Sequence, residues 1–168
     1  SSGLVISEVG YEKAAQDLGI PVSQLEESIN KRLRKIKYLP KDEPDMMETE
    51  LNVDTHIAKY AARLATRRHC GYVEAVHSKT TSEVQHGKNL EEVTTIIGTG
   101  GPIINNADPR TILAEALENE RDIKMRRLLP KEATFMVDGD YILYAAGILK
   151  EIDPEAAMSI MKNSLRLV

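Results

Sequence analysis

Aromatic residues and cysteine are scarce in this chain of 168 residues. It has six tyrosines, one phenylalanine and no tryptophan, so aromatic residues make up 4% of the sequence. Proteins that stack nucleic-acid bases need exposed aromatic platforms, and this composition argues against such a function. The one cysteine, Cys70, cannot form a disulfide within the chain and fits a reducing compartment.

The chain also lacks an excess of positive charge and a long apolar run. It has 22 Lys and Arg residues against 26 Asp and Glu residues, which gives a formal net charge of −4. Surfaces that bind nucleic acid or anionic lipid need clustered positive charge. No apolar stretch reaches the length of a membrane-spanning helix. The sequence therefore predicts a cytoplasmic protein that binds neither nucleic acid nor a membrane.

What is present is the composition of a globular domain, with 42% hydrophobic and 29% charged residues. The length fits one domain of common size. The chain begins Ser1-Ser2-Gly3 and has no methionine before Met46. We therefore expect it to be a piece of a longer protein, and such a piece can hold only part of an active site.

Residues 1–51 are predicted to be a helical segment followed by an acidic connector. A weak helical pattern spans Tyr11 to Leu18, and a stronger one spans Ser23 to Lys37 with basic residues late, as the helix dipole favours. These basic residues could bind a partner, but a solvated helix face is the more common explanation. Residues 41–50 are acidic and contain a proline, which indicates a loop or joint.

Residues 52–168 are predicted to form an α/β nucleotide-binding half-domain. A helix is expected from Asn52 or Asp54 to His69, and the period then changes to that of strands. The β-branched run at 93–97 is typical of a buried strand. Further strands are predicted at 72–76, 134–138 and, as a turn or returning strand, 80–87. Helices are predicted to begin at Asp108, Asp140 and Asp153, each with the aspartate as its cap. The predicted fold is a short mixed sheet covered by helices.

The most informative motif is Gly98-Thr99-Gly100-Gly101, directly after the 93–97 run. Its glycines permit a sharp turn and remove side chains that would block a flat or phosphorylated ligand. In open α/β sheets, ligands bind beyond the carboxyl ends of the strands. The motif is neither a P-loop nor a dinucleotide fingerprint, because no Gly-Lys-Ser/Thr follows and Ile103 replaces the third glycine. A nucleotide site and a tight structural turn without a ligand are equally consistent with this spacing.

Other polar residues give weaker evidence for a functional site. Asp138 follows a strand, where a carboxylate can contact a water bound to Mg²⁺, but Asp138 and Asp140 more commonly end a strand and cap the next helix. One cysteine cannot supply a zinc cage, and the four histidines show no metal-ligand spacing. The four histidines are His56, His69, His77 and His86. No metal site is therefore predicted, and no catalytic residue is assigned.

Several motifs in a fixed order resemble the carboxyl-terminal part of the MutL family of glutamate mutase accessory proteins, which is unrelated to the mismatch-repair proteins of the same name. The resemblance runs from about Ala58 to the end of the chain. The matching segments are the alanine-rich helix ending Arg68-His69-Cys70-Gly71, Gly87-Lys88-Asn89-Leu90, Val93, Ile96-Ile97-Gly98-Thr99-Gly100-Gly101, Leu128-Leu129-Pro130, Asp138, Tyr141-Ile142-Leu143 and Ala146-Gly147.

This resemblance implies the superfamily of acetate and sugar kinases, Hsp70 chaperones and actin, whose members hold ATP between two related domains. The fold implied here is that of the second domain. The Gly98–Gly101 turn would then lie against the adenosine of ATP or ADP, bound with Mg²⁺ in the complete protein. The implied function is an ATP-driven chaperone that frees damaged cobalamin from an inactivated adenosylcobalamin-dependent mutase, and the implied partners are the mutase subunits and an amino-terminal ATPase lobe.

The early phosphate-binding motifs of that superfamily are missing from the chain, and the first 50 residues match the family poorly. We therefore expect this chain to be unable to hydrolyse ATP alone, although the complete protein would be an ATPase. The same absence argues against a free-standing small kinase. The alternative is a non-catalytic interaction module, in which the Ser23–Lys37 helix and the Met46-Met47 connector bind a partner and the glycine turn is structural.

Overall fold

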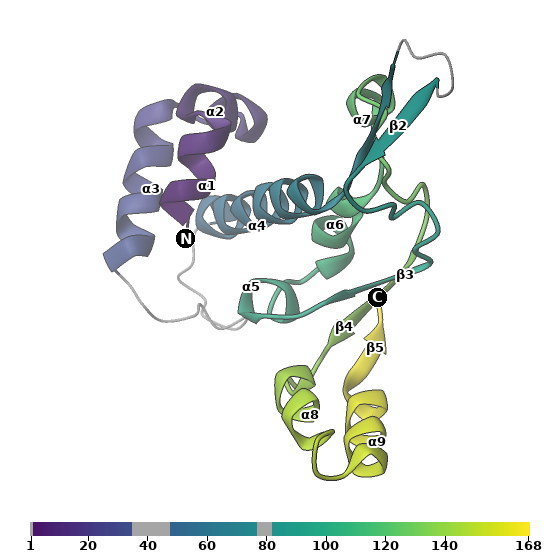
Figure 1. Ribbon diagram of the computed structural model, residues 1–168. Helices are drawn as coiled ribbons and strands as arrows, with labels where there is room; N and C mark the ends of the chain where they lie inside the picture. Colours follow the sequence, from purple (N-terminus) through teal and green to yellow (C-terminus); the bar gives the residue numbers. More distant parts are fainter. Residues whose placement is uncertain (1, 35–47, 77–81) are drawn as a thin grey trace.

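The computed structural model describes residues 2–34, 48–76 and 82–168, and these combine helices with short sheets, as the sequence predicted (Figure 1). The predicted connector at 41–50 and the end of the basic helix at Lys37 lie largely or wholly outside the described residues. No helix in the described ranges is both long and apolar enough to cross a bilayer.

Three helices form the first layer: α1 (Ser2–Val9), α2 (Tyr11–Leu18) and α3 (Val22–Arg34). The prediction that α2 ends at Gly19 is confirmed. Gly19 adopts the left-handed conformation with φ 67°, and its N–H is directed at the last carbonyls of the helix. Buried side chains of these helices meet the first half of the next helix in one apolar core. They are Ile6, Ala14, Ala15, Leu25, Ile29, Val53 and Tyr60.

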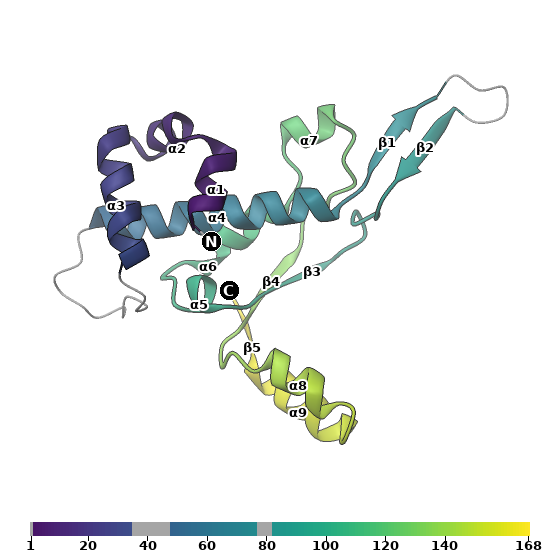
Figure 2. The ribbon, with the colours of Figure 1, turned by 60° about the vertical axis from the view of Figure 1, so that its left-hand side comes forward.

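The long helix α4 (Glu48–His69) runs from this layer to the rest of the molecule, as both ribbon views show (Figures 1 and 2). Its predicted end at His69 is confirmed, with basic residues in the last turn that suit the helix dipole. The prediction of a start at Asn52 or Asp54 was wrong, because the helix already begins at Glu48.

A two-stranded hairpin follows α4 and projects from the body of the molecule (Figure 2). Its strands, β1 (Tyr72–Ala75) and β2 (Glu83–His86), pair antiparallel, so the returning strand expected at 80–87 is confirmed. At its base, the N–H of Gly71 donates to the carbonyl of Lys88 at 2.7 Å. The two backbone segments approach closely there, and a Cβ on Gly71 would lie 2.1 Å from the carbonyl oxygen of His86.

The second sheet has three strands in the order β3-β4-β5. Strands β3 (Thr95–Gly98) and β4 (Thr134–Asp138) are parallel, whereas β5 (Leu165–Leu167) is antiparallel to β4. The predicted short mixed sheet is therefore confirmed. Its likeness to the actin and Hsp70 fold stays a prediction.

The prediction that β3 is a buried strand was wrong. Ile97 is 43% exposed, and only Gly98 of this strand is buried. The β-branched residues correctly predicted a strand. Among the described strands, however, β3 lies at the edge of the sheet and not in its centre. β4, with Phe135 and Val137 buried, occupies the centre.

A series of short helices connects β3 to β4, and the first two of them pack against the sheet. They are α5 (Gly101–Ile104), α6 (Pro109–Leu113), the 3₁₀ helix η1 (Ala114–Ala116) and α7 (Glu120–Lys124). Leu113 of α6 packs on Phe135 and Val137, which makes the second core of the molecule. Pro109 begins α6 as predicted, but the side chain of Asp108 makes no capping hydrogen bond.

The chain ends with α8 (Leu143–Leu149), α9 (Pro154–Ser164) and β5. The two helices pack against each other and extend away from the sheet in both views (Figures 1 and 2). The predicted cap of α9 is confirmed, since Asp153 accepts a hydrogen bond from the N–H of Ala156 at 3.0 Å. The last helix stops at Ser164, and Leu165 begins β5.

Candidate functional site

The glycine turn and Asp138 meet at the carboxyl edge of the parallel pair β3–β4. Gly98 lies opposite Val137 in the register, so the residues that follow, Thr99 and Asp138, lie side by side at this edge. The hydroxyl of Thr99 donates to Oδ2 of Asp138 at 3.2 Å. This is the edge at which α/β proteins commonly bind ligands.

The glycines of the turn have different surroundings. Gly98 is buried, and a Cβ there would lie 2.7 Å from Leu113 and 2.8 Å from Ile103, so Gly98 lets α5 and α6 approach the sheet. Gly100 has φ 97°, which disfavours every other residue type, and nothing lies within 4 Å of the place of its Cβ. Open space for a ligand is therefore found at Gly100 and not at Gly98.

Gly101 is buried and begins α5, a helix that the sequence analysis did not predict. Gly100 occupies the N-cap position, and Pro102 lies in the first turn, where proline is favoured. The Gly-Pro pair was the available signal. It was overlooked because the helix has only four residues and no apolar periodicity of its own.

Asp138 is completely buried and accepts hydrogen bonds at both carboxylate oxygens. The N–H groups of Ile142 and Leu143 donate to it at 3.1 and 2.9 Å, and the Ser164 hydroxyl and Thr99 donate as well. Burial would raise the pKa of Asp138, but these hydrogen bonds outweigh it and hold the pKa below its ordinary value. With four donors in place, the carboxylate has no lone pair directed at a magnesium-bound water. Of the two roles considered for Asp138, the structure favours the helix cap.

The prediction that Asp140 caps α8 was wrong. That helix starts after Ile142, and its free N–H groups are bound by Asp138. Asp140 forms a surface ion pair with Arg166 of β5 at 2.6 Å instead. Asp138 takes the capping role because Tyr141, with φ 56°, turns the chain back over the end of β4.

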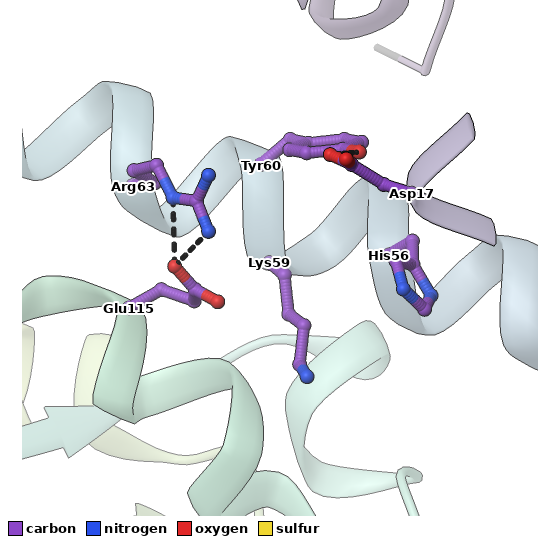
Figure 3. Close-up of a pocket in the computed structure, with 6 residues that line it drawn as sticks. All are labelled: Asp17, His56, Lys59, Tyr60, Arg63 and Glu115. Atoms are coloured by element: carbon purple, nitrogen blue, oxygen red, sulfur yellow. Dashed lines mark hydrogen bonds and ion pairs between the residues drawn. The ribbon is translucent and has the colours of Figure 1, made fainter. Parts of the chain in front are cut away.

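A second polar region is an open cavity of about 260 Å³ between α2, α4 and η1 (Figure 3). Its lining residues are Asp17, His56, Lys59, Tyr60, Arg63 and Glu115. Nε of Arg63 donates to Glu115 at 2.7 Å, and the hydroxyl of Tyr60 donates to Asp17 at 2.7 Å. Hydrogen bonds from Lys13 and Tyr60 lower the pKa of Asp17, whereas burial and the bond to Asp17 raise the pKa of Tyr60. Because both carboxylates are already paired, these contacts join α2 and η1 to α4 and do not indicate a reaction.

This cavity was not predicted from the sequence. Four of its residues, at 56, 59, 60 and 63, recur at helical spacing on one side of α4, which was the available signal. Asp17 and Glu115 come from elements distant in the sequence, so their presence depends on the tertiary fold.

The described histidines, His56, His69 and His86, and Cys70 have partners other than the residues of the carboxyl edge. His69 contacts Nζ of Lys88 at 3.3 Å, and His86 pairs with Glu74 at 2.9 Å. His77 lies outside the described residues. Cys70 is buried, with its sulfur 3.9 Å from Arg127. Within the part of the chain that the structure describes, no three His, Cys, Asp or Glu residues gather in a way that could hold a metal ion.

The fold and this edge define a mixed α/β protein in which a glycine turn follows a parallel strand. A family model described as "MutL protein" matches residues 1–165, and the chain belongs to this family. It is 33% identical over 135 residues to Protein MutL of Clostridium tetanomorphum, an alignment that covers 80% of this chain. No solved structure matches the chain significantly.

The match with the MutL family model extends to the amino-terminal helices. Residues 1–50 were expected to match the family poorly, but the family model begins at residue 1. The chain spans only 28% of the length of the Clostridium tetanomorphum relative.

Proposed function

We propose that this chain is the carboxyl-terminal part of an ATP-dependent reactivating factor for an adenosylcobalamin-dependent mutase of the glutamate mutase type. Membership of the MutL family supports this proposal, and so does the length of the Clostridium tetanomorphum relative, of which the alignment covers 28%. In this proposal the remainder of the protein supplies the phosphate-binding motifs, and the subunits of the mutase are the partners. The complete protein would hydrolyse ATP, whereas this chain alone would not.

The role that we propose for the chain is to place the Gly98–Gly101 turn against the adenosine of ATP or ADP. The observation that carries this role is the open position at Gly100, at the carboxyl edge of the parallel strands. A residue without a side chain allows the flat adenine or the ribose to contact the backbone. Thr99 is held to Asp138 and would keep the turn in place when the nucleotide arrives. Asp138 would not itself hold the Mg²⁺, because its oxygens are already bonded.

The test is nucleotide binding by the complete protein with Gly100→Ala. A Cβ at Gly100 would occupy the open space and strain a backbone with φ 97°, so we expect ATP affinity to fall about tenfold or more, which corresponds to about 1.4 kcal/mol. Titration calorimetry with ATP and ADP measures the effect.

Gly19→Ala is the matched control. Gly19 also has a positive φ and no atom within 4 Å of the Cβ position, but it lies at the end of α2. The Gly19→Ala variant should lose about as much stability as Gly100→Ala but should bind ATP as tightly as the wild type. Equal affinity in the wild type and both variants would contradict the proposed role of the turn.

The alternative is an interaction module in which the glycine turn is structural. The surroundings of Gly98 favour it, since that glycine serves the packing of Leu113 and Ile103. Of the segments that would bind a partner, the Ser23–Lys37 helix is described up to Arg34 as α3, and Met46-Met47 lies outside the described residues. A complete protein that captures mutase subunits but binds no nucleotide would support this alternative.

A further inference from the structure

The strand β3 has one paired edge and one edge that no described strand covers. The sheet order is β3-β4-β5, so β4 is the only strand beside β3 within residues 82–168 and the other described ranges. The pair is parallel. Many mixed sheets have an antiparallel strand at the edge of an otherwise parallel sheet, whereas β3 is a parallel strand at the edge of the described sheet.

The backbone of β3 has hydrogen-bonding groups directed at this free edge. The N–H of Thr134 donates to the carbonyl of Thr94 at 2.8 Å, which fixes Thr94 as a residue that bonds to β4. Because successive residues of a strand present their backbone groups to opposite sides, Ile96 and Gly98 also bond to β4. The N–H and C=O groups of Thr95 and Ile97 then point away from β4.

Nothing in the sequence of this strand protects the edge. The residues from Val93 to Gly98 include no charged residue and no proline, the two devices that commonly keep edge strands from pairing. Val93 and Ile97 are 36% and 43% exposed. An uncharged, β-branched edge of this kind is a template for another strand.

We propose that the free edge of β3 pairs with a strand from the part of the complete polypeptide that lies outside these 168 residues. The Clostridium tetanomorphum relative is several times longer than the matched segment, so most of the complete protein is available for this contact. A second copy of the chain is a weaker candidate, because a strand of four residues buries far less than the roughly 1,200 Å² that a stable interface needs. This inference rests on the proposed function only in taking the chain as part of a longer protein.

Hydrogen exchange in the complete protein, without nucleotide, tests the pairing directly. The amides of Thr95 and Ile97 should exchange at least about a hundredfold more slowly than an unprotected amide, as is also expected for the amide of Ile96, which bonds to β4. Fast exchange at Thr95 and Ile97 beside slow exchange at Ile96 would overturn the proposal. Protection that disappears on dilution would also overturn it, because it would assign the edge to a second copy.

Proline substitution provides a second measurement on the complete protein. Proline is tolerated on a free edge when its missing N–H faces solvent, but not where that N–H bonds to a strand. Ile97→Pro should therefore lower the midpoint of thermal unfolding as much as Ile96→Pro, which removes a bond to β4. Ile97→Ala controls for the lost side chain. If Ile97→Pro unfolds at the same temperature as Ile97→Ala, the edge is free and the proposal is wrong. Neither measurement uses nucleotide, so failure here is separate from failure of the proposed function.

Discussion

At the scale of single residues, Asp138 is the polar group on which the carboxyl edge depends. It is completely buried at the end of β4, and its donors lie in the glycine turn, at the start of α8 and at the end of α9. A buried carboxylate is stable only when its oxygens are bonded, and removal of one partner leaves the others unsatisfied. The same residue therefore fixes the turn, the helix start and the C-terminal strand.

We predict that Asp138→Ala lowers the free energy of unfolding by roughly 2–4 kcal/mol, because buried N–H and hydroxyl groups lose their acceptor. Asp140→Ala removes only an exposed ion pair with Arg166 and should cost about 0–1 kcal/mol. Urea unfolding of both variants measures the difference. A small effect of Asp138→Ala would show that the network contributes little to stability.

The lowered pKa of Asp138 gives this prediction a pH dependence. A carboxyl group whose pKa is lower in the folded state stabilises the protein above its ordinary pKa of 3.8, and this contribution disappears as the pH falls through the folded value. The gap in stability between the wild type and Asp138→Ala should therefore be constant near neutral pH and shrink below about pH 4. Unfolding curves measured over this range test the sign, and a gap that grows on acidification contradicts it.

At the scale of elements, close packing at two glycines determines how the sheets connect to their neighbours. Gly71 lies against the backbone of the β1–β2 hairpin, whereas Gly98 lies against the ends of two side chains of the connecting helices. Side-chain ends can rotate away from an added methyl group, but a strand backbone can move only together with its ladder. Similar contacts at the two positions therefore have different consequences.

We predict that Gly71→Ala destabilises the protein more than Gly98→Ala. A Cβ at Gly71 would meet the His86 carbonyl at 2.1 Å, so we expect a loss of about 3 kcal/mol or more, against roughly 1–2 kcal/mol at Gly98. Gly147→Ala is the control, since it fills open space on a helix and should be neutral or slightly stabilising. Denaturant midpoints of the three variants give the order, and a larger loss at Gly98 would contradict this account.

At the scale of the whole molecule, α4 connects the two cores. Its first half belongs to the amino-terminal core, and near its end Arg67 binds the segment that crosses from β3 to β4. The guanidinium donates to the carbonyls of Glu115 and Leu117 and forms a buried ion pair with Asp122. Asp122 also completes the capping box of α7, so one side chain holds several turns of that segment.

We predict that Arg67→Lys lowers the free energy of unfolding by about 1–3 kcal/mol, because an ammonium group cannot reproduce the planar fork that reaches the carboxylate and both carbonyls. Arg68→Lys is a neighbouring control: its side chain is 66% exposed and pairs with Glu8 at the surface. That variant should change stability by no more than about 0.5 kcal/mol. Equal losses in the two variants would show that the contacts of Arg67 are dispensable.

The sequence by itself determined the features that depend on near neighbours. Gly19 ends α2 and Asp153 caps α9 because each signal acts within a few residues, and the α/β class follows from the change of hydrophobic period after Gly71. Only the tertiary structure decided that β3 lies at an edge and that Asp138, rather than Asp140, caps α8. Burial and hydrogen-bond partners depend on which distant segment lies alongside, and local patterns carry no information about that.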